Sequence, residues 1–441
     1  MKRNCRRHRL VAWTAVAAVA LVGSACSSTA SSSTSTTSAS TAPSTTGAGT
    51  GSIPASAFTD RTGITANSVS VANISTLSAG LFKGSPVGTQ AYADYVNSTG
   101  GINGRKMDVT GYDDQFQGAQ NAQSTNAAVG QDFALVGGFS LEDSFGAAIL
   151  AKNPGVPSVG ESIEAATNAL PNYYSPVPQQ PGYQEGSLQY FKKKYPSDIG
   201  AVGTLIGNLP SNATTWAGDK YAMTKVGYKV SYVGVYGVTQ TDYNADVVAM
   251  KNAGVKMLFL DQMNDTYASS VMKALNQQSF HPVVILGAAA YTASMVSESG
   301  GAANVDGSYL SMQYSLFLGQ DSPAIPAVST FLHWIQVASP GFKPDLFSLY
   351  GWLSAEMFAQ ALKNAGSNPS RGSVLQQLAK VTSFNGQGLM APTNPAAHTI
   401  SNCYLLVQVA NGDFVRIDDP PISGTTGGFR CDYTFLSPPK A

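Results

Sequence analysis

The chain has 441 residues, and its 26 Lys plus Arg are balanced by 26 Asp plus Glu, so the formal net charge is zero and only 12% of residues are charged. This balance argues against a nucleic-acid-binding protein, which needs a basic surface. The length suffices for two domains with full hydrophobic cores, and 44 Gly, 20 Tyr and 18 Phe favour a loop-rich α/β protein with aromatic-lined clefts.

The N-terminus has the pattern of a signal peptide over residues 1–25. Basic residues precede an apolar run at 10–22, which is too short to span a bilayer comfortably, and small residues at 23–25 lead to Cys26. This arrangement resembles a bacterial lipobox, in which the cysteine becomes the lipidated N-terminus, although Gly23 stands where Leu is usual. We therefore expect lipidation at Cys26, with a simple cleaved signal peptide as the alternative.

Residues 26–60 are expected to form a flexible tether. From 27 to 46 the sequence is almost entirely Ser and Thr, a composition that cannot build a hydrophobic core. A lipid anchor followed by such a tether would hold a soluble binding protein near a membrane.

A βαβ unit follows the tether. The strand Val69–Ile74 precedes a helix with apolar residues at helical spacing, and Gly100 lies where a left-handed C-cap is needed. Asn103 and Gly104 then turn the chain into a strand in which Met107 and Val109 share one face. Strand, helix and strand in this order predict the beginning of a parallel sheet.

Polar and aromatic residues follow the strands of this first half. Ser78 and Phe82 come after the strand Val69–Ile74, at the edge where open α/β sheets bind ligands, although Phe82 is equally well placed to pack in the core. Ser140 follows the strand 133–138 and is placed to cap the helix at 145–152, as is Asp143. The free N–H groups of this helix start would suit a carboxylate.

A second strand and helix series occupies residues 199–286. Strands are predicted at 199–206, 229–235, 255–260 and 283–286, with helices at 216–226, 242–253 and 266–275. Regular alternation over this length indicates a second doubly wound lobe. Later, a helix at 354–365 is expected after the segment 342–352.

Several ordered motifs resemble the leucine/isoleucine/valine-type extracytoplasmic solute-binding proteins of ABC importers. They are Gly100–Arg105 with the acids 113–114, Gln240–Tyr243, Gly254–Leu260, Pro344–Trp352, Phe384–Gly388 and Gln408–Gly412, and together they span residues 67–417. The resemblance implies the type I periplasmic binding protein fold, an α/β fold of two doubly wound Rossmann-like lobes joined by three chain crossings near residues 183, 312 and 400. The N-terminal lobe would comprise 61–182 and 313–400, and the C-terminal lobe 183–312 and 401–441.

The resemblance also implies which residues bind the ligand. The family holds an amino-acid carboxylate on the loop that here is Phe139–Leu141. The predicted ligand-binding residues are Ser78, Phe82, Phe139, Ser140, Leu141, Ser162, Asn212, Asp261, Asn264 and Tyr291.

One departure from the family bears on the ligand. The family's second lobe supplies an acid after the strand at 283–286 to pair the ligand ammonium, whereas this chain has Ala288 to Tyr291 there. Burying an ammonium without a counter-charge is costly, so this departure argues against a plain branched-chain amino acid. Asp261 either replaces the missing acid or caps the helix at 266–275.

The cysteines and histidines limit the other possible roles. Cys403 and Cys431 remain after the signal peptide and anchor are set aside, and outside the cytoplasm we expect them to form a disulfide. A two-cysteine metal site is the alternative, but His398 is the one histidine near them. The chain has no HExxH or GxSxG motif and no metal-ligand spacing, so we expect neither an enzyme nor a metal or cofactor.

The predicted function is therefore capture of a small polar solute, such as an amino-acid-like compound, an amide or a carboxylate. A monomeric, membrane-anchored binding protein would deliver this solute to an ABC permease. The alternative is a ligand-sensing receptor that contacts a separate membrane signalling protein.

Overall fold

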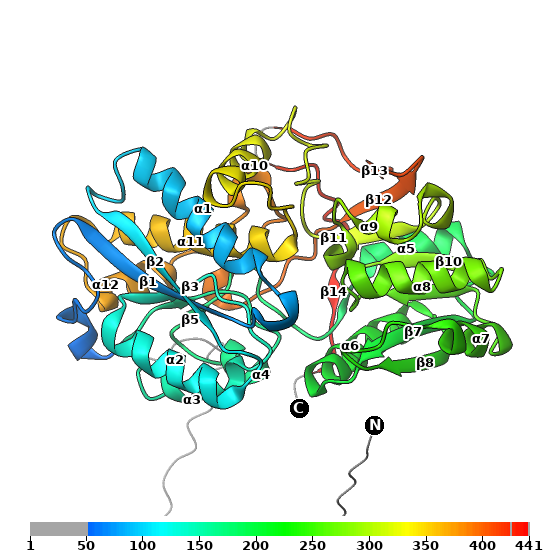
Figure 1. The fold of residues 1–441 in the computed structure, drawn as a ribbon, viewed down its shortest axis with the longest axis horizontal. Helices are drawn as coiled ribbons and strands as arrows, with labels where there is room; N and C mark the ends of the chain where they lie inside the picture. Colours follow the sequence, from blue (N-terminus) through cyan, green and yellow to red (C-terminus); the bar gives the residue numbers. More distant parts are fainter. Residues whose placement is uncertain (1–51, 424–425, 440–441) are drawn as a thin grey trace, which may run out of the picture. The chain divides into compact units, whose positions relative to one another are not determined.

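The computed structural model describes residues 52–423 and 426–439, which lie in one compact unit (Figure 1). The signal peptide, Cys26 and the Ser/Thr-rich run lie outside the described residues. The end of the expected tether does not: η1 (Ala55–Phe58) buries Ala57, and Asp60 forms an ion pair with Arg371 at 2.9 Å. Folded structure thus begins before residue 61.

The first lobe is built on a parallel sheet with the strand order β2-β1-β3-β4-β5. Its strands are β1 (Ser68–Ser75), β2 (Lys106–Asp113), β3 (Ala134–Val136), β4 (Ser158–Val159) and β5 (Tyr173–Tyr174). Helices α1, α10 and α11 lie on one side of this sheet, and α2 and α3 lie on the other (Figure 1). The helices are α1 (Gly84–Ser98), α2 (Gly118–Gln131), α3 (Asp143–Leu150), α4 (Ala165–Asn168), α10 (Pro326–Ala338), α11 (Leu346–Asn364) and α12 (Arg371–Leu378), with short 3-10 helices η2 (Ser78–Gly80), η5 (Gly386–Gly388) and η6 (Pro395–Ala397).

The second lobe is built on a mixed sheet with the order β13-β12-β11-β10-β9-β7-β8, in which β12 runs antiparallel to both of its neighbours. Its strands are β7 (Val202–Gly207), β8 (Val230–Tyr236), β9 (Met257–Leu260), β10 (Val283–Leu286), β11 (Tyr309–Met312), β12 (Leu405–Ala410) and β13 (Asp413–Arg416). Its helices are α5 (Glu185–Lys194), α6 (Pro210–Val226), α7 (Asn244–Asn252), α8 (Asp265–Gln277) and α9 (Met295–Glu298), with 3-10 helices η3 (Ala288–Ala290) and η4 (Ala302–Asn304).

Strand β9 shows why this lobe is covered on both faces. Successive side chains of a strand point to opposite faces, so a fully apolar strand needs a hydrophobic layer on each side. Met257 and Phe259 pack in the core formed with α5 and α6, whereas Leu258 and Leu260 pack in the core formed with α7 and α8. The predicted α/β architecture with two doubly wound lobes is confirmed.

The first βαβ unit is also confirmed. Helix α1 ends at Ser98, and Gly100 and Gly101 both have positive φ, at +98° and +77°. At Gly101 a Cβ would lie 2.2 Å from the carbonyl oxygen of Arg105, so the turn into β2 requires glycine there. In β2, Met107 is buried and Val109 half-buried, on the predicted face.

Two helices begin six or more residues earlier than predicted. Helix α11 starts at Leu346 because Asp345 and Ser348 form a capping box, in which each side chain bonds the backbone N–H of the other. Helix α6 starts at Pro210, since proline fits the first turn of a helix. In both cases the loop that precedes the helix is shorter than predicted.

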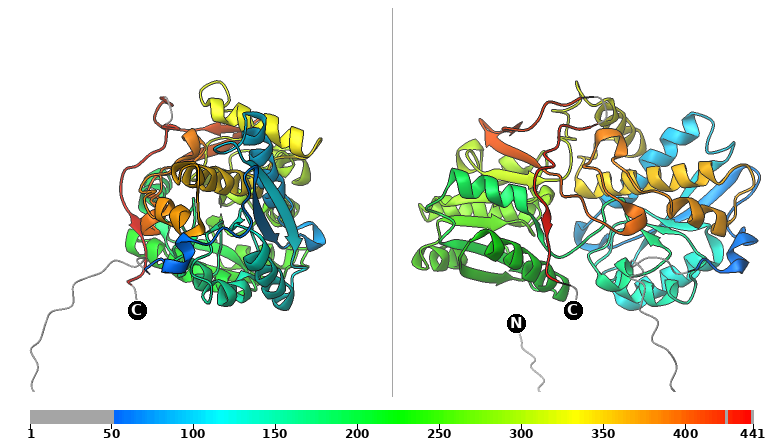
Figure 2. Two further views of the ribbon diagram at one scale, coloured as in Figure 1. Left: turned by 90° about the vertical axis from the view of Figure 1, so that its left-hand side faces the viewer. Right: turned by 180° about the vertical axis from the view of Figure 1, so that it is seen from behind.

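The C-terminal segment runs along the junction of the lobes (Figure 2). Strand β14 (Phe435–Leu436) pairs with β6 (Tyr183–Gln184), where the chain first enters the second lobe. Tyr404, where the chain re-enters the second lobe, forms an isolated antiparallel β-bridge with Arg430. Beside this β-bridge, Cys403 forms a disulfide bond with Cys431. The predicted disulfide is confirmed. We call residues 426–436 the C-terminal strap.

Candidate ligand-binding cleft

A pocket of about 630 Å³ opens between loops of the two lobes. The first lobe contributes residues that follow β1 and β2, together with the connection from α10 to α11. The second lobe contributes residues that follow β8, β9 and β10. These are carboxyl ends of strands, where open α/β sheets bind ligands, and the volume suits a small organic molecule.

Of the predicted site residues, Ser78, Phe82 and Asn264 line this pocket. Phe82 packs edge-on against Phe139 and Phe347, with ring centroids 4.7 and 4.6 Å away. Phe82 therefore takes part in an aromatic cluster of its own lobe and also faces the pocket. Phe82 thus has both of the roles that the sequence allowed, packing in the core and lining the pocket.

Three backbone donors of the loop expected to cradle a carboxylate are occupied. The N–H of Phe139 donates to Ser75 Oγ at 3.1 Å, and the N–H of Leu141 donates to Thr76 Oγ1 at 3.3 Å. The N–H of Glu142 is also used within the loop. A carboxylate ligand here would have to displace these internal hydrogen bonds.

Ser140 is buried and bonded within the protein. Its hydroxyl donates to Asp114 Oδ2, and its oxygen accepts from Asn121 Nδ2 at 3.1 Å and from the Glu142 N–H at 2.8 Å. Because the carboxylate of Asp114 already occupies this hydroxyl, a ligand carboxylate would meet a negative charge. Ser140 reaches the start of α3 only through the Glu142 N–H, and Asp143 caps no helix in the described structure.

Two further acids lie behind this loop in a largely apolar setting. Burial raises the pKa of Glu161 to about 8 and that of Asp143 to about 7. Glu161 accepts hydrogen bonds from Ser175 and Gln179, and within the described residues it has no ion-pair partner. The first lobe thus surrounds the expected carboxylate loop with acids.

The second lobe holds a polar network at the ends of β7 and β9. Asn212 donates to Gln262 Oε1 at 2.9 Å, and Gln262 in turn approaches Asp219 at 3.5 Å. Tyr183 approaches Asp261 with its hydroxyl at 3.4 Å. Burial raises the pKa of Asp261 to about 6, and burial next to Asp261 raises that of Asp219 well above its usual value.

Of the two roles left open for Asp261, replacing the missing acid or capping a helix, the structure removes the second. The cap of α8 is Asn264, whose side chain accepts from the Tyr267 N–H at 3.2 Å. Asp261 is therefore free of the capping role, and we keep its ligand-binding role as a prediction. Asp219 and Gln262 were missed by sequence reasoning, although a carboxylate on the buried face of α6 was a signal that could have found Asp219.

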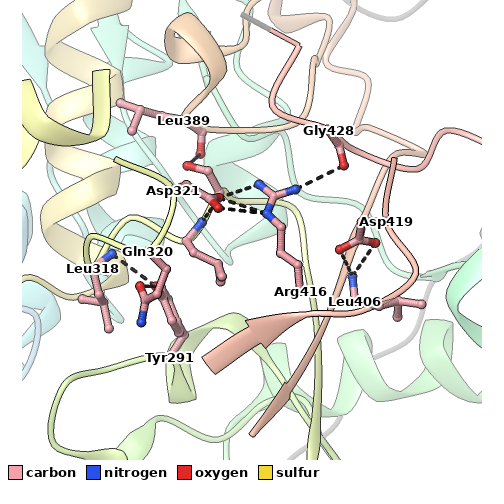
Figure 3. A network of polar contacts seen from close by, with 11 residues as sticks. Tyr291, Leu318, Gln320, Asp321, Leu389, Leu406, Arg416, Asp419 and Gly428 are labelled. Atoms are coloured by element: carbon pink, nitrogen blue, oxygen red, sulfur yellow. Dashed lines mark hydrogen bonds and ion pairs between the residues drawn. The ribbon is translucent and has the colours of Figure 1, made fainter. Parts of the chain in front are cut away.

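The remaining predicted residues are turned into the protein. Tyr291 is fully buried; its hydroxyl donates to Gln320 and accepts from the Leu318 N–H at 3.2 Å (Figure 3). Ser162 is also fully buried and accepts from the Glu164 N–H at 2.9 Å. In this conformation neither side chain is open to the pocket.

Neither a metal cluster nor a membrane-spanning helix is found among the described residues. There, no group of three or more His, Cys, Asp or Glu side chains is arranged to hold a metal ion. Among the helices in residues 52–423 and 426–439, none is long and apolar enough to cross a membrane.

Several solved structures with a similar fold are described as substrate-binding proteins. The fatty acid ABC transporter substrate-binding protein from Thermomonospora curvata has a TM-score of 0.66 and 15% identity, with 86% of this chain and 95% of that chain covered. LivJ from Streptococcus pneumoniae, solved with isoleucine, has a TM-score of 0.64 and 16% identity, with 80% and 100% covered. These likenesses establish the type I periplasmic binding protein fold.

Sequence relatives agree with the fold. The "Amino acid binding protein" of Pseudomonas aeruginosa is 22% identical over 292 residues, which cover 64% of this chain and 74% of that protein. The "Leu/Ile/Val-binding protein homolog 1" of Brucella suis biovar 1 is 24% identical over 301 residues, covering 64% and 73%. The family model described as "Periplasmic binding protein" matches residues 69–413. The resemblance found in the sequence is thereby confirmed, and the chain belongs to the periplasmic binding protein family.

Proposed function

We propose that this protein is an extracytoplasmic solute-binding lipoprotein that captures a small solute between its lobes and delivers it to an ABC importer. The observation that carries the proposal is the pocket of about 630 Å³, to which both lobes contribute strand-end loops. A ligand bound by both walls favours the closed arrangement of the lobes, and a permease can recognise that arrangement.

The finer parts of the proposal rest on sequence. Cys26 carries the lipid anchor, and the Ser/Thr-rich run links it to the folded part. The first lobe comprises 61–182 with 313–400, together with the short segment before residue 61 that packs on it, the second lobe comprises 183–312 with 401–441, and the protein acts as a monomer. The two sheets support these boundaries, since β1–β5 belong to one and β7–β13 to the other.

The test begins with the solute that copurifies with the protein, identified by mass spectrometry. Titration of that solute should decrease the radius of gyration measured by small-angle X-ray scattering, because closure makes the molecule more compact. Vesicles containing the cognate permease should then take up the solute only when the binding protein is present. A solute that binds without closure, or uptake that does not need the protein, would contradict the proposal and leave a sensing role.

A further inference from the structure

The two walls of the interlobe pocket differ in chemistry. The first lobe presents the apolar side chains Leu81, Phe82, Phe116, Phe342 and Phe347, with the exposed cations Lys83 and Lys343 beside them. The second lobe presents mainly hydroxyl and amide side chains from the loops after β8, β9 and β10. A solute that fits both walls must be apolar on one side and polar on the other.

Two of the phenylalanines have an unfavourable backbone. Phe82 and Phe116 have φ values of 50° and 56°, in the left-handed region that costs a residue with a Cβ about 1–2 kcal/mol. The N–H of Phe116 donates to Asp114 Oδ1 at 3.0 Å, which helps to hold this backbone. Such strain is retained where the surrounding structure imposes it, often at ligand sites.

Phe116 also lacks an aromatic neighbour. Its exposed fraction is 37%, and within the described residues it takes part in no ring pair, whereas Phe82 packs against two rings. Ring packing within the first lobe therefore does not offset the backbone strain at Phe116. A ligand that covers the ring of Phe116 would recover this exposed apolar area.

The polar wall offers uncharged groups. The hydroxyls of Thr239, Thr241 and Thr266 make no hydrogen bond to the described part of the chain, and all three residues are exposed. The acid on this wall is bonded within its own lobe: Asp265 Oδ2 accepts from the hydroxyls of Thr292 at 2.8 Å and Ser294 at 3.0 Å. The wall can therefore bond the oxygen atoms of a ligand without a charged partner.

We propose that the pocket selects an amphipathic solute whose apolar body covers Phe116 and Phe82 and whose oxygen-bearing side faces the threonines, rather than an α-amino acid. This inference rests on the proposed function, because it assigns the solute class of the same cleft. The occupied N–H groups of Phe139 and Leu141 agree with it, since these two donors of the expected cradle are already bonded within the protein.

The test uses 1-anilinonaphthalene-8-sulfonate, whose fluorescence rises when its aromatic rings leave water. We expect one dye per folded protein and displacement of the dye by the copurified solute. Phe116→Ala should weaken dye binding about ten-fold or more, because it removes a large part of the apolar wall. The matched control is Phe145→Ala, which removes a Phe that is 53% exposed outside this pocket.

Equal dye affinity of Phe116→Ala and the unmodified protein would overturn the inference, as would an equal loss in Phe145→Ala. Thermal melts of both variants establish that each is folded. If isoleucine binds and closes the protein while Phe116→Ala leaves its affinity unchanged, the solute class proposed here is wrong but solute capture stands. If neither dye nor any copurified solute binds between the lobes, the proposed function fails as well.

Discussion

Glu161→Gln is expected to stabilise the protein at alkaline pH. Glu161 lies just after β4, is 2% exposed, and accepts hydrogen bonds from Ser175 and Gln179. A glutamine side chain has nearly the same size and keeps one acceptor oxygen. Its NH₂ group can donate to the side-chain oxygen of Gln179 once the amide of Gln179 has flipped. The substitution thus removes the ionisable group with little change in packing.

The magnitude follows from the raised pKa of Glu161, about 8 against a usual 4.5. Between these values the native state keeps a proton that the unfolded chain has released, so the stability contributed by this group falls as pH rises through that window. At about 1.4 kcal/mol per pH unit over roughly 3.5 units, the loss has an upper bound of about 5 kcal/mol. Glutamine cannot ionise and avoids this loss.

The assay is urea unfolding of both proteins at pH 5 and pH 9. We expect similar stability at pH 5, where Glu161 is protonated in the native state, and a variant more stable by at least about 2 kcal/mol at pH 9. Glu298→Gln, at an exposed position on α9, is the control and should leave the pH dependence unchanged. A difference between Glu161→Gln and the unmodified protein that stays constant from pH 5 to 9 would refute the reasoning.

Three further predictions concern stability. Gly88→Ala should lower the free energy of unfolding in urea by about 1–3 kcal/mol, because its Cβ would lie 1.8 Å from a carbonyl oxygen of α11. Gly111→Ala, which has open space around its Cβ, is the control and should not lower it; equal losses of stability in the two variants would contradict this packing. Replacing Cys403 and Cys431 together by Ala should cost about 3–4 kcal/mol on the chain-entropy estimate for a separation of 28 residues, and an unchanged melting temperature would speak against it. Phe116→Gly should be more stable than Phe116→Ala by about 1 kcal/mol in thermal melts, since glycine tolerates φ of 56°; the reverse order would show that the backbone is unstrained.

The fold was predictable because local signals agreed with one another. The spacing of apolar residues, the glycines after α1 and the repeated strand and helix order all pointed to parallel sheets, and β10 was predicted at Val283–Leu286 as observed. Helix starts were less predictable. The capping box of Asp345 and Ser348 and the proline at 210 decide them, and these short patterns compete with turn signals in the same segments.

The site was less predictable because distant residues determine which groups are free. Asp114 accepts the hydrogen bond of the Ser140 hydroxyl although the two residues are 26 positions apart in the sequence. Ser75 accepts that of the Phe139 N–H across 64 positions. No local pattern marks such pairs. The position of Phe116 in the pocket was missed for the same reason, since its left-handed backbone is imposed by the turn after β2.

The position of the C-terminal strap in the chain has a consequence for the order in which the protein folds. Strand β14 pairs with β6 across some 250 positions of sequence, Phe435 with Gln184, and every strand of both sheets precedes it. As the chain emerges, the sheets can therefore form before β14 pairs with β6. Cys431 meets Cys403 only when this late segment has emerged, so the disulfide forms no earlier than the strap itself. We expect the strap to be the last part of the described fold to dock, after both sheets have formed.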